Sequence, residues 1–325
     1  MRAAWYERTG DAESVLTVGE MPTPEPGDGE VRVRVHLPGV NPGDTKKRLG
    51  WQDGAMPYPR VVPHSDAAGV IDAVGPDVDA DRVGRRVWVH GAQSYRAFGT
   101  AAEYVVVPDD LAVALPDEVP DELGACLGIP GITAHRAVFA DGPLADSVVL
   151  VHGVLGGVGR LAAQLARRAG ALVVGTVRSS GDVPAAAEIV DHVVALDTDD
   201  PAGAIRRIAP EGVDRVVEVS LSDNVRLDAA VTALGGVVVA YASRDGEPSI
   251  PFWPMLFANL TLRLVGSDDV PVEAKRAAAA ELTQAAREGA LHVPAVDPLP
   301  LADIARAHEL VDAGSRRRVL LDPRR

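Results

Sequence analysis

The sequence predicts an α/β protein in two parts, a partly open β-barrel followed by a doubly wound parallel sheet. Residues 1–120 contain short strand-like runs interrupted by proline and glycine, which is typical of an antiparallel barrel. Residues 121–266 alternate apolar strands with helical segments, which indicates a parallel sheet with crossover helices. The 325 residues suffice for two domains with separate cores. We therefore expect a barrel domain over 1–120, completed by 267–325, and a parallel-sheet domain over 121–266.

The barrel part is expected to contain four strands at its start and a returning segment at its end. The strands lie at 31–35, 67–74, 86–89 and 102–107, and a proline-rich turn covers 21–29. After the parallel sheet, an alanine-rich helix is expected over 272–289 and a second helix over 301–313. A last strand at 318–321 then returns the chain to the barrel.

The second part is expected to form one sheet of six parallel strands. The strands are predicted at 148–151, 172–176, 192–195, 215–219, 237–241 and 262–265. Helices are predicted between them at 184–189, 201–208 and 225–234. Strands joined by crossover helices pack as a doubly wound sheet with helices on both faces.

The composition narrows the class of function. The formal net charge of −14 repels phosphate backbones, which argues against nucleic acid as the main partner. The single cysteine, Cys126, excludes a disulfide framework and a cysteine-rich metal site. The N-terminus lacks a secretory signal, and no uncharged apolar stretch is long enough to suggest a membrane span. These features predict a cytoplasmic globular protein.

A glycine-rich turn after the strand at 148–151 is the most specific motif. Gly153, Gly156 and Gly159 have the spacing G-x-x-G-x-x-G and lead into an amphipathic helix. Strand, tight turn and helix place a pyrophosphate at a helix N-terminus, where backbone N–H groups point at the ligand. An ordinary βα turn is the alternative interpretation. The other residues of the predicted cofactor-binding turn are Val154, Leu155, Gly157 and Val158.

The end of the next strand indicates which dinucleotide binds. NAD-binding folds place a carboxylate there to hold the ribose hydroxyls. Here Thr176 ends the strand, Arg178 and Ser179 follow, and the first acid is Asp182. Because a guanidinium pairs bidentately with phosphate oxygens, Arg178 suits a 2′-phosphate, and NADPH is favoured. The alternative is a solvated loop arginine.

Several further motifs follow one another along the chain. They are GVNPGD at 39–44, PHSDAAGVIDAVG at 63–75, AEY at 102–104, GIPGITAHR at 128–136, HGVLGGVG at 152–159 and GG at 235–236. In this order they resemble the zinc-independent quinone oxidoreductases, the zeta-crystallin-like branch of the medium-chain dehydrogenases/reductases. The resemblance implies a GroES-like catalytic domain, a Rossmann domain that binds NADPH, and a homodimer formed through the Rossmann sheet edge at 262–265.

The resemblance also implies that no catalytic zinc is present. The zinc-dependent relatives carry a cysteine at the position of Asn41 and a histidine at that of Ser65, and a catalytic zinc needs about three protein ligands. His64 lies one residue earlier, and we expect it to be a hydrogen-bonded structural residue. Without a Lewis acid, hydride transfer to a conjugated acceptor is favoured over alcohol oxidation.

The resemblance assigns roles to individual residues. Asn41 is expected to donate to a carbonyl oxygen that gains charge, or else to cap the loop before Pro42. Thr133 is expected to lie against the nicotinamide, or else to be a helix-interior residue. Arg318 is expected to reach the 2′-phosphate. The remaining cofactor residues lie at strand ends facing the carboxamide, and they are Val219, Tyr241, Ala242 and Ser243.

The substrate pocket departs from the family pattern. Lys46 occupies a position where related quinone reductases carry a tyrosine, and Trp51 stands near a second such position. Lys46, Trp51 and Tyr58 are predicted to line the pocket. Trp253 and Phe257 are further aromatic candidates, and core or interface packing is the alternative for all four aromatic residues. The favoured activity is NADPH-dependent reduction of a quinone or an α,β-unsaturated carbonyl. An enoyl reductase acting on acyl thioesters and a non-catalytic NADPH-binding protein are the alternatives.

Overall fold

The computed structural model describes residues 1–50 and 54–325. They form two compact units. Unit 1 comprises Met1–Pro130, Ala279–Arg287 and His292–Arg325, and unit 2 comprises Gly131–Ala278 and Glu288–Leu291. The predicted α/β class is confirmed, since one unit holds an antiparallel sheet and the other a parallel sheet. The chain leaves each unit later than the boundaries at 120 and 266 that the sequence predicted.

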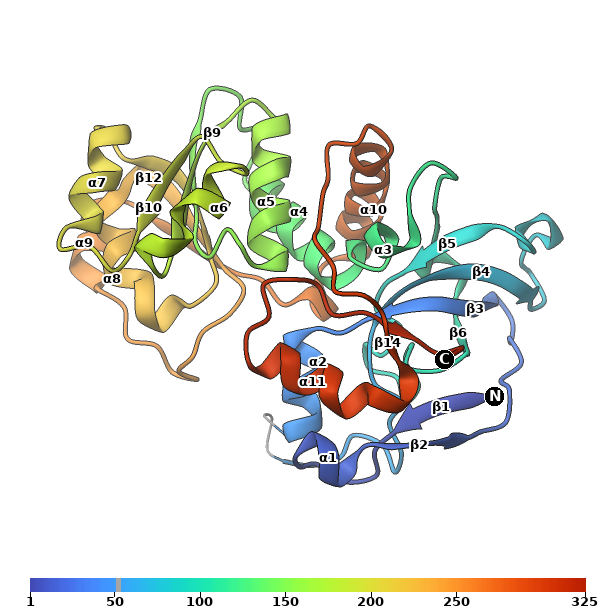
Figure 1. Cartoon of the computed structure of the whole chain (residues 1–325). Coiled ribbons are helices and arrows are strands. Elements are labelled where there is room, and N and C mark those ends of the chain that lie inside the picture. Colours follow the sequence, from blue (N-terminus) through green and yellow to red (C-terminus); the bar gives the residue numbers. More distant parts are fainter. Residues whose placement is uncertain (51–53) are drawn as a thin grey trace. The chain divides into compact units, whose positions relative to one another are not determined.

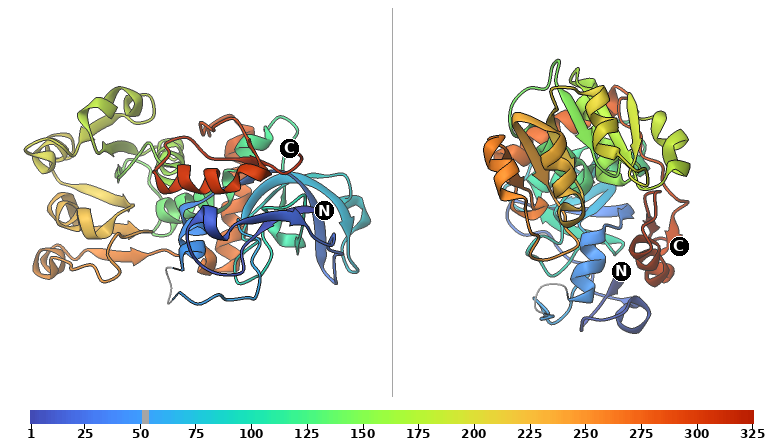
Figure 2. Two further views of the ribbon diagram at one scale, coloured as in Figure 1. Left: turned by 60° about the horizontal axis from the view of Figure 1, so that its bottom comes forward. Right: turned by 90° about the vertical axis from the view of Figure 1, so that its left-hand side faces the viewer.

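Unit 1 is built on a five-stranded antiparallel sheet that curls into an open half-barrel (Figure 2). Irregularities in the pairing of β3 with β4 bend the sheet, because a bulge increases the local twist. Val31, Val33 and Val35 alternate inward along β3 and form the barrel core. In spatial order the strands are β6 (Tyr104–Pro108), β3 (Glu30–Gly39), β4 (Asp66–Val74), β5 (Arg86–Val89) and β7 (Ala112–Ala114).

A second layer of unit 1 joins the two ends of the chain. The sequence analysis missed the hairpin of β1 (Arg2–Trp5) and β2 (Thr17–Glu20). The C-terminal helix and strands share one apolar core with this hairpin, which explains why the tail returns to unit 1. The other elements of this layer are α1 (Ala12–Val15), α2 (Pro42–Leu49), β14 (Leu299–Pro300), α11 (Ile304–Asp312) and β15 (Leu321–Asp322), whereas α3 (Asp121–Gly124) packs on β3, β4 and β5 of the half-barrel.

Unit 2 contains the six-stranded parallel sheet that the sequence predicts. The order of the strands reverses between β8 and β11, so β8 and its neighbour define the switch point at which such sheets bind ligands. Valine and leucine dominate the buried strand positions, as expected for a sheet covered on both faces. In spatial order the strands are β10 (His192–Ala195), β9 (Leu172–Val177), β8 (Val148–Val151), β11 (Val213–Glu218), β12 (Thr232–Ala240) and β13 (Thr261–Leu264).

Helices cover both faces of this sheet, with α5 on one side and α7 with α8 on the other (Figure 1). Ile205 of α7 and Val231 of α8 pack on Leu150, Val174 and Val238 of the strands. The helices are α4 (Ile132–Phe139), α5 (Gly157–Arg168), α6 (Val183–Ala187), α7 (Pro201–Ile208), α8 (Leu221–Val231), α9 (Phe252–Phe257) and α10 (Val272–Arg287), the last continuing into unit 1.

The predicted helix over 225–234 ends too late. Helix α8 stops at Val231, and β12 begins at Thr232. Gly235 has a φ of +76°, outside the helical region, and a Cβ at Gly236 would lie 2.5 Å from the Thr232 side chain. A β-branched residue followed by a glycine pair therefore favours a bent strand over a helix here.

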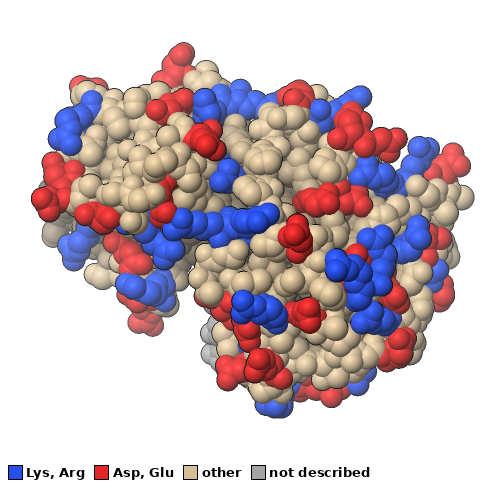
Figure 3. All heavy atoms as spheres, viewed as in Figure 1, with Lys and Arg blue, Asp and Glu red and all other residues tan. Residues whose placement is uncertain are grey.

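None of the described helices combines the length and the apolar character that crossing a bilayer requires. On the face drawn in Figure 3, acidic and basic side chains are interspersed. Many of them form ion pairs within a unit, such as Arg32 with Asp72 and Arg82 with Asp109.

Candidate functional site

The turn between β8 and α5 requires glycine at two of its positions. Gly153 has a φ of +62°, in the left-handed region. A Cβ on Gly159 would lie 2.5 Å from the Gly153 carbonyl oxygen, so the first turn of α5 approaches this backbone more closely than any other residue allows. The Gly156 N–H donates to the same carbonyl over 2.9 Å and closes the turn.

This turn presents the N-terminus of α5 as an anion site. Gly156 is the exposed N-cap residue in an extended conformation, and the first turn of the helix contains no acidic residue. The first N–H groups of a helix have no partner within it and carry partial positive charge. Of the residues predicted to bind the cofactor, Val154 and Leu155 bury their side chains, so only their backbone is available. Gly157 and Val158 are half-buried within the first turn.

Thr176 of β9 stabilises the turn through hydrogen bonds. Its side chain is fully buried, and its hydroxyl accepts the Gly153 N–H over 3.3 Å. The same hydroxyl lies 2.9 Å from Nδ1 of His152, and the Thr176 carbonyl accepts the Val154 N–H over 3.2 Å. Thr176, which the sequence predicts to contact the cofactor, is buried here, and its hydroxyl holds the turn.

A buried cluster of one histidine and two carboxylates continues this network. Nε2 of His152 lies 2.9 Å from Oδ1 of Asp228 and 3.5 Å from Oε2 of Glu218. The three groups bring one nitrogen and two oxygens within 4.8 Å, and the His152–Asp228 contact is a hydrogen bond. Glu218 also accepts from the Ser220 N–H and from the Asn224 amide.

Ionisation in this cluster is strongly perturbed. Burial raises the pKa of Glu218 to about 7, against the opposing effect of His152. Burial lowers the pKa of His152, but Asp228 and Glu218 together outweigh it and leave the pKa raised. The sequence analysis missed Glu218 and Asp228, because an acid at a strand end and an acid within a helix are ordinary features until the fold brings them together.

The predicted strand-end residues lie along the same edge of the sheet. Val219 is the neighbour nearest to a Cβ built on Gly153, at 3.2 Å, so it contacts the turn. Tyr241 donates its backbone N–H to the Glu218 carbonyl, and burial raises the pKa of its phenol. Ala242 accepts from Leu221. The half-buried Ser243 has a buried hydroxyl with no partner among the described residues.

Arg178 and Ser179 follow β9 directly and are exposed. Ser179 caps a short turn, where its hydroxyl accepts the Gly181 N–H. The fold also brings an acid to this place: Asp197 accepts from the backbone and the hydroxyl of Ser180, which lowers the pKa of its carboxyl. The sequence analysis missed Asp197, because only the pairing of β9 with β10 brings it to the end of β9.

Asn41 belongs to a buried cluster within unit 1. Its amide donates to Oδ2 of Asp66 over 2.8 Å, and its carbonyl oxygen accepts from Arg318 over 2.7 Å. Arg318 also lies 3.2 Å from Oδ2 of Asp66 and donates to the Val40 carbonyl. Asn41 is 1% exposed. It is also the N-cap residue of α2, where its backbone N–H donates to the Asp44 carboxylate.

The placement of Arg318 corrects its predicted role. Its guanidinium is buried, and its two terminal nitrogens bind Val40, Asn41 and Asp66. A guanidinium already paired with a buried carboxylate cannot also clamp a phosphate bidentately. Arg318 therefore joins the last segment of unit 1 to β4, in place of the contact with a 2′-phosphate that the sequence analysis predicted.

The other predicted site residues are distributed over both units. Thr133 is buried near the start of α4 in unit 2. Lys46 is half-buried on α2, and Tyr58 donates its hydroxyl to the Tyr95 carbonyl in unit 1. Trp51 lies outside the described residues. Next to Lys46 on α2, Asp44 accepts the Asn41 N–H over 2.7 Å, and burial raises its pKa to about 7.

The residues around Asn41 do not fit a catalytic zinc. Both oxygen and nitrogen of the Asn41 amide are engaged with ionised partners, and Arg318 places a fixed cation at this position. Ser65 is buried and offers a neutral hydroxyl. Nε2 of His64 lies 2.9 Å from Nε2 of His308, so this histidine is hydrogen-bonded within the core. A zinc site needs thiolate, imidazole or carboxylate ligands that can converge, and this set does not supply them.

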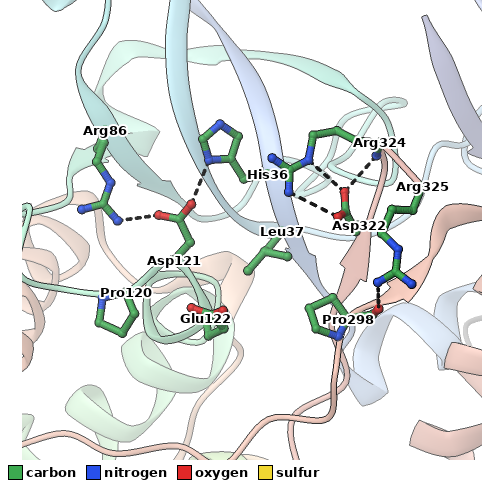
Figure 4. A pocket seen from close by; sticks show the side chains of 10 residues that line it. All are labelled: His36, Leu37, Arg86, Pro120, Asp121, Glu122, Pro298, Asp322, Arg324 and Arg325. Atoms are coloured by element: carbon green, nitrogen blue, oxygen red, sulfur yellow. Dashed lines mark hydrogen bonds and ion pairs between the residues drawn. The ribbon is translucent and has the colours of Figure 1, made fainter.

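A hollow of about 390 Å³ opens elsewhere in unit 1 (Figure 4). Asp121 at its wall is bound by both His36 and Arg86, and Asp322 is bound by Arg324. None of the predicted site residues lines it. Its cations and carboxylates pair with one another, so nothing in this hollow indicates that it is the substrate pocket.

Each of the two units contains a segment that matches a known protein family. Residues 27–117 match the family of the alcohol dehydrogenase GroES-like domain, and residues 157–284 match the zinc-binding dehydrogenase family. The human quinone oxidoreductase is 31% identical over 325 residues, covering 97% of this chain and 95% of its own length.

Two solved structures show the same fold. An NAD-dependent alcohol dehydrogenase superposes with a TM-score of 0.87 at 27% identity, over 99% of both chains. A mycobacterial protein complexed with NADPH superposes with a TM-score of 0.83 at 28% identity, over 99% of this chain and 100% of its own. The predicted resemblance is thus confirmed by both kinds of comparison.

Replacing Arg318 tests the buried cluster of unit 1. Arg318→Met keeps much of the side-chain volume but leaves Asp66 as an uncompensated buried charge, so we expect a loss of about 3–5 kcal/mol in the free energy of unfolding. Urea unfolding followed by tryptophan fluorescence measures it. Arg316→Met, two residues away on the exposed surface, is the control. Equal stability of the two variants would contradict a supporting role for Arg318.

Proposed function

Because this chain belongs to the quinone oxidoreductase family of the medium-chain dehydrogenases/reductases, we propose that it reduces a quinone or another α,β-unsaturated carbonyl with NADPH, without zinc. The observation that carries this proposal is the turn of unit 2. It requires glycine at positions 153 and 159, and it places the N-terminus of α5 at the switch point of a parallel sheet. This is the geometry that receives a dinucleotide pyrophosphate.

The choice of NADPH rests on Arg178. It is exposed directly after β9, where a 2′-phosphate is expected to lie. Asp197 on the neighbouring connection accepts from both donors of Ser180, so its oxygens are already engaged there. A free carboxylate at this place would favour the ribose hydroxyls of NADH instead. The solved relative with bound NADPH supports the same choice.

When bound, NADPH supplies the hydride, and the protein supplies orientation and hydrogen bonds. The oxygen of the Asn41 amide and one of its N–H groups are held by Arg318 and Asp66. Within the proposal, the remaining N–H donates to the carbonyl oxygen that gains charge, and the cation on the amide oxygen strengthens that donor. Thr133 is proposed to lie against the nicotinamide, and Lys46 to line the substrate pocket.

A homodimer through the edge of the parallel sheet is part of the proposal. The edge strand β13 pairs on one side only among the described strands, and Leu264 on it is 72% exposed. Trp253 and Phe257 of α9 stack 5.9 Å apart and are both exposed. An unpaired strand edge beside exposed aromatic residues is a surface that a second copy can cover symmetrically.

We also propose a cytoplasmic location. The one cysteine, Cys126, is buried and free, and burial raises the pKa of its thiol to about 11. A buried thiol outside any disulfide is typical of proteins in a reducing compartment such as the cytoplasm.

The purified protein should oxidise NADPH in the presence of a benzoquinone or a small enone and contain no stoichiometric zinc. A panel with quinones, enones, an acyl-thioester enoyl substrate and ethanol separates the proposed function from an enoyl reductase and from a non-catalytic protein. Activity should survive EDTA, since no step depends on a Lewis acid. One zinc per chain together with ethanol oxidation that a chelator abolishes would overturn the proposal.

Arg178→Ala should weaken NADPH binding by about 10- to 150-fold, because a charge-assisted bond to the 2′-phosphate is lost. The affinity for NADH should change little, since NADH lacks that phosphate. Fluorescence titration with both cofactors gives the two dissociation constants. Arg167→Ala, another partly exposed arginine of unit 2, serves as the control. An equal loss for NADH and NADPH would refute the assignment.

Leu264→Lys should convert a dimer to a monomer, because a charge on each copy would face its symmetry mate across the sheet edge. Light scattering after size-exclusion chromatography measures the mass. Val83→Lys adds the same charge at an exposed apolar position of unit 1 and should leave the mass unchanged. A wild-type mass equal to one chain at micromolar concentration would remove the dimer from the proposal.

A further inference from the structure

A chain of hydrogen bonds connects the nucleotide turn with the buried carboxylate of Asp228, and the carboxylate of Glu218 lies 3.5 Å from the same imidazole nitrogen. The chain of hydrogen bonds begins at the Gly153 N–H, which donates to the Thr176 hydroxyl. That hydroxyl lies 2.9 Å from Nδ1 of His152, and Nε2 of the same imidazole lies 2.9 Å from Asp228. The imidazole therefore contacts the turn through one nitrogen and a carboxylate through the other, so its state bears on the Thr176 hydroxyl that holds Gly153.

The two carboxylates beside His152 are incompletely hydrogen-bonded. Oε2 of Glu218 and Oδ2 of Asp228 are buried and have no hydrogen-bond partner among the described residues. Both residues are 0% exposed. With both carboxylates ionised, the single imidazole leaves an excess negative charge in a site without water contact. One additional proton removes that charge and turns one orphaned acceptor into a donor.

We propose that His152, Asp228 and Glu218 form a proton-sharing cluster that positions the glycine turn, so that NADPH binding takes up a proton into this cluster. The inference rests on the proposed function, because it assigns the pyrophosphate of NADPH to the turn. In it, Glu218 and His152 are positioning residues that act through Thr176 and the charge beneath Gly153.

The surroundings of Glu218 favour the uptake and release of a proton near neutral pH. His152 after β8 and Asp228 on α8 are the charged groups that face it, and the Tyr241 phenol after β12 is the further titratable neighbour. Glu218 also accepts hydrogen bonds from the Ser220 N–H and from the Asn224 amide of α8. Burial, the largest effect, raises the pKa of Glu218 to about 7. The site therefore changes its proton content within the physiological range.

The direction in which NADPH affinity changes with pH follows from the charge of the cluster. Below a pH of about 7 Glu218 is protonated, and the cluster beneath the turn is close to neutral. Above it, the cluster is anionic and repels the pyrophosphate on the other side of the turn. NADPH should therefore bind less tightly as the pH rises through this value. By reciprocity, bound NADPH raises the affinity of the cluster for its proton.

Titration of NADPH fluorescence between about pH 6 and pH 8.5 tests the inference, because linkage makes the slope of log Kd against pH equal to the protons taken up. Across this range the ratio of the Kd values of wild type and Glu218→Gln should change by roughly three- to tenfold, since the amide keeps the shape of the side chain but cannot ionise. The 2′-phosphate of NADPH also titrates nearby, but equally in both proteins. Glu211→Gln, at an exposed carboxylate before β11, is the matched control and should follow wild type.

Calorimetry in buffers of different ionisation enthalpy provides a second readout. Wild type should take up a fraction of a proton on binding NADPH near neutrality, and Glu218→Gln should take up less. Thr176→Val should weaken binding at every pH, whereas Thr176→Ser retains the hydroxyl and should bind normally. Identical pH slopes and proton uptake in wild type and Glu218→Gln would overturn the inference while leaving the proposed function intact. Absence of NADPH binding at any pH would instead refute the proposed function.

Discussion

The close approach of two backbone segments, the Gly153 carbonyl and the first turn of α5, is the constraint on which the nucleotide site depends. A single Cβ at Gly159 would lie 2.5 Å from that carbonyl. With glycine there, the helix begins directly at the end of β8, and its N-terminal N–H groups face outward at the switch point of the sheet. Thr176 and His152 then keep the turn in place from within the core.

Unit 1 meets a different requirement, which is to keep the cation of Arg318 and the carboxylate of Asp66 buried together. Arg318 lies close to Asn41 and Asp66, and Asp66 also accepts the Ile129 N–H. These contacts join segments far apart in the sequence, so the C-terminal strands and the barrel stabilise each other. The guanidinium fixes the Asn41 amide in one orientation, because it binds only the amide oxygen. In this family member a fixed positive charge therefore comes from the chain itself.

Local patterns in the sequence predict many of the strands and helices, but they predict few of the buried polar contacts. Strands β8 and β10 and helix α7 have the predicted bounds, because apolar runs with flanking turn residues encode them locally. The turn was found for the same reason. Asp197, Glu218 and Asp228 reach their partners only through the pairing of parallel strands, and Arg318 joins Asp66 across most of the chain. No spacing rule relates residues whose proximity is created by the tertiary fold.

Two buried acids with raised pKa values, Asp44 and Glu218, lower the free energy of unfolding at neutral pH. Their presence therefore calls for a reason other than stability. Asp44 and Glu218 both have a pKa of about 7 in the folded chain, well above that of an exposed carboxyl. The stability that each contributes is fully present below its unfolded pKa and is lost as the pH rises through about 7. A neutral side chain of similar shape would avoid this loss. Each acid, however, supports a site of the proposed function: Asp44 accepts the N–H of Asn41, and Glu218 lies 3.5 Å from His152, which directly precedes the nucleotide turn. Local rules are typically broken in this way at functional positions, where geometry is maintained at the expense of stability.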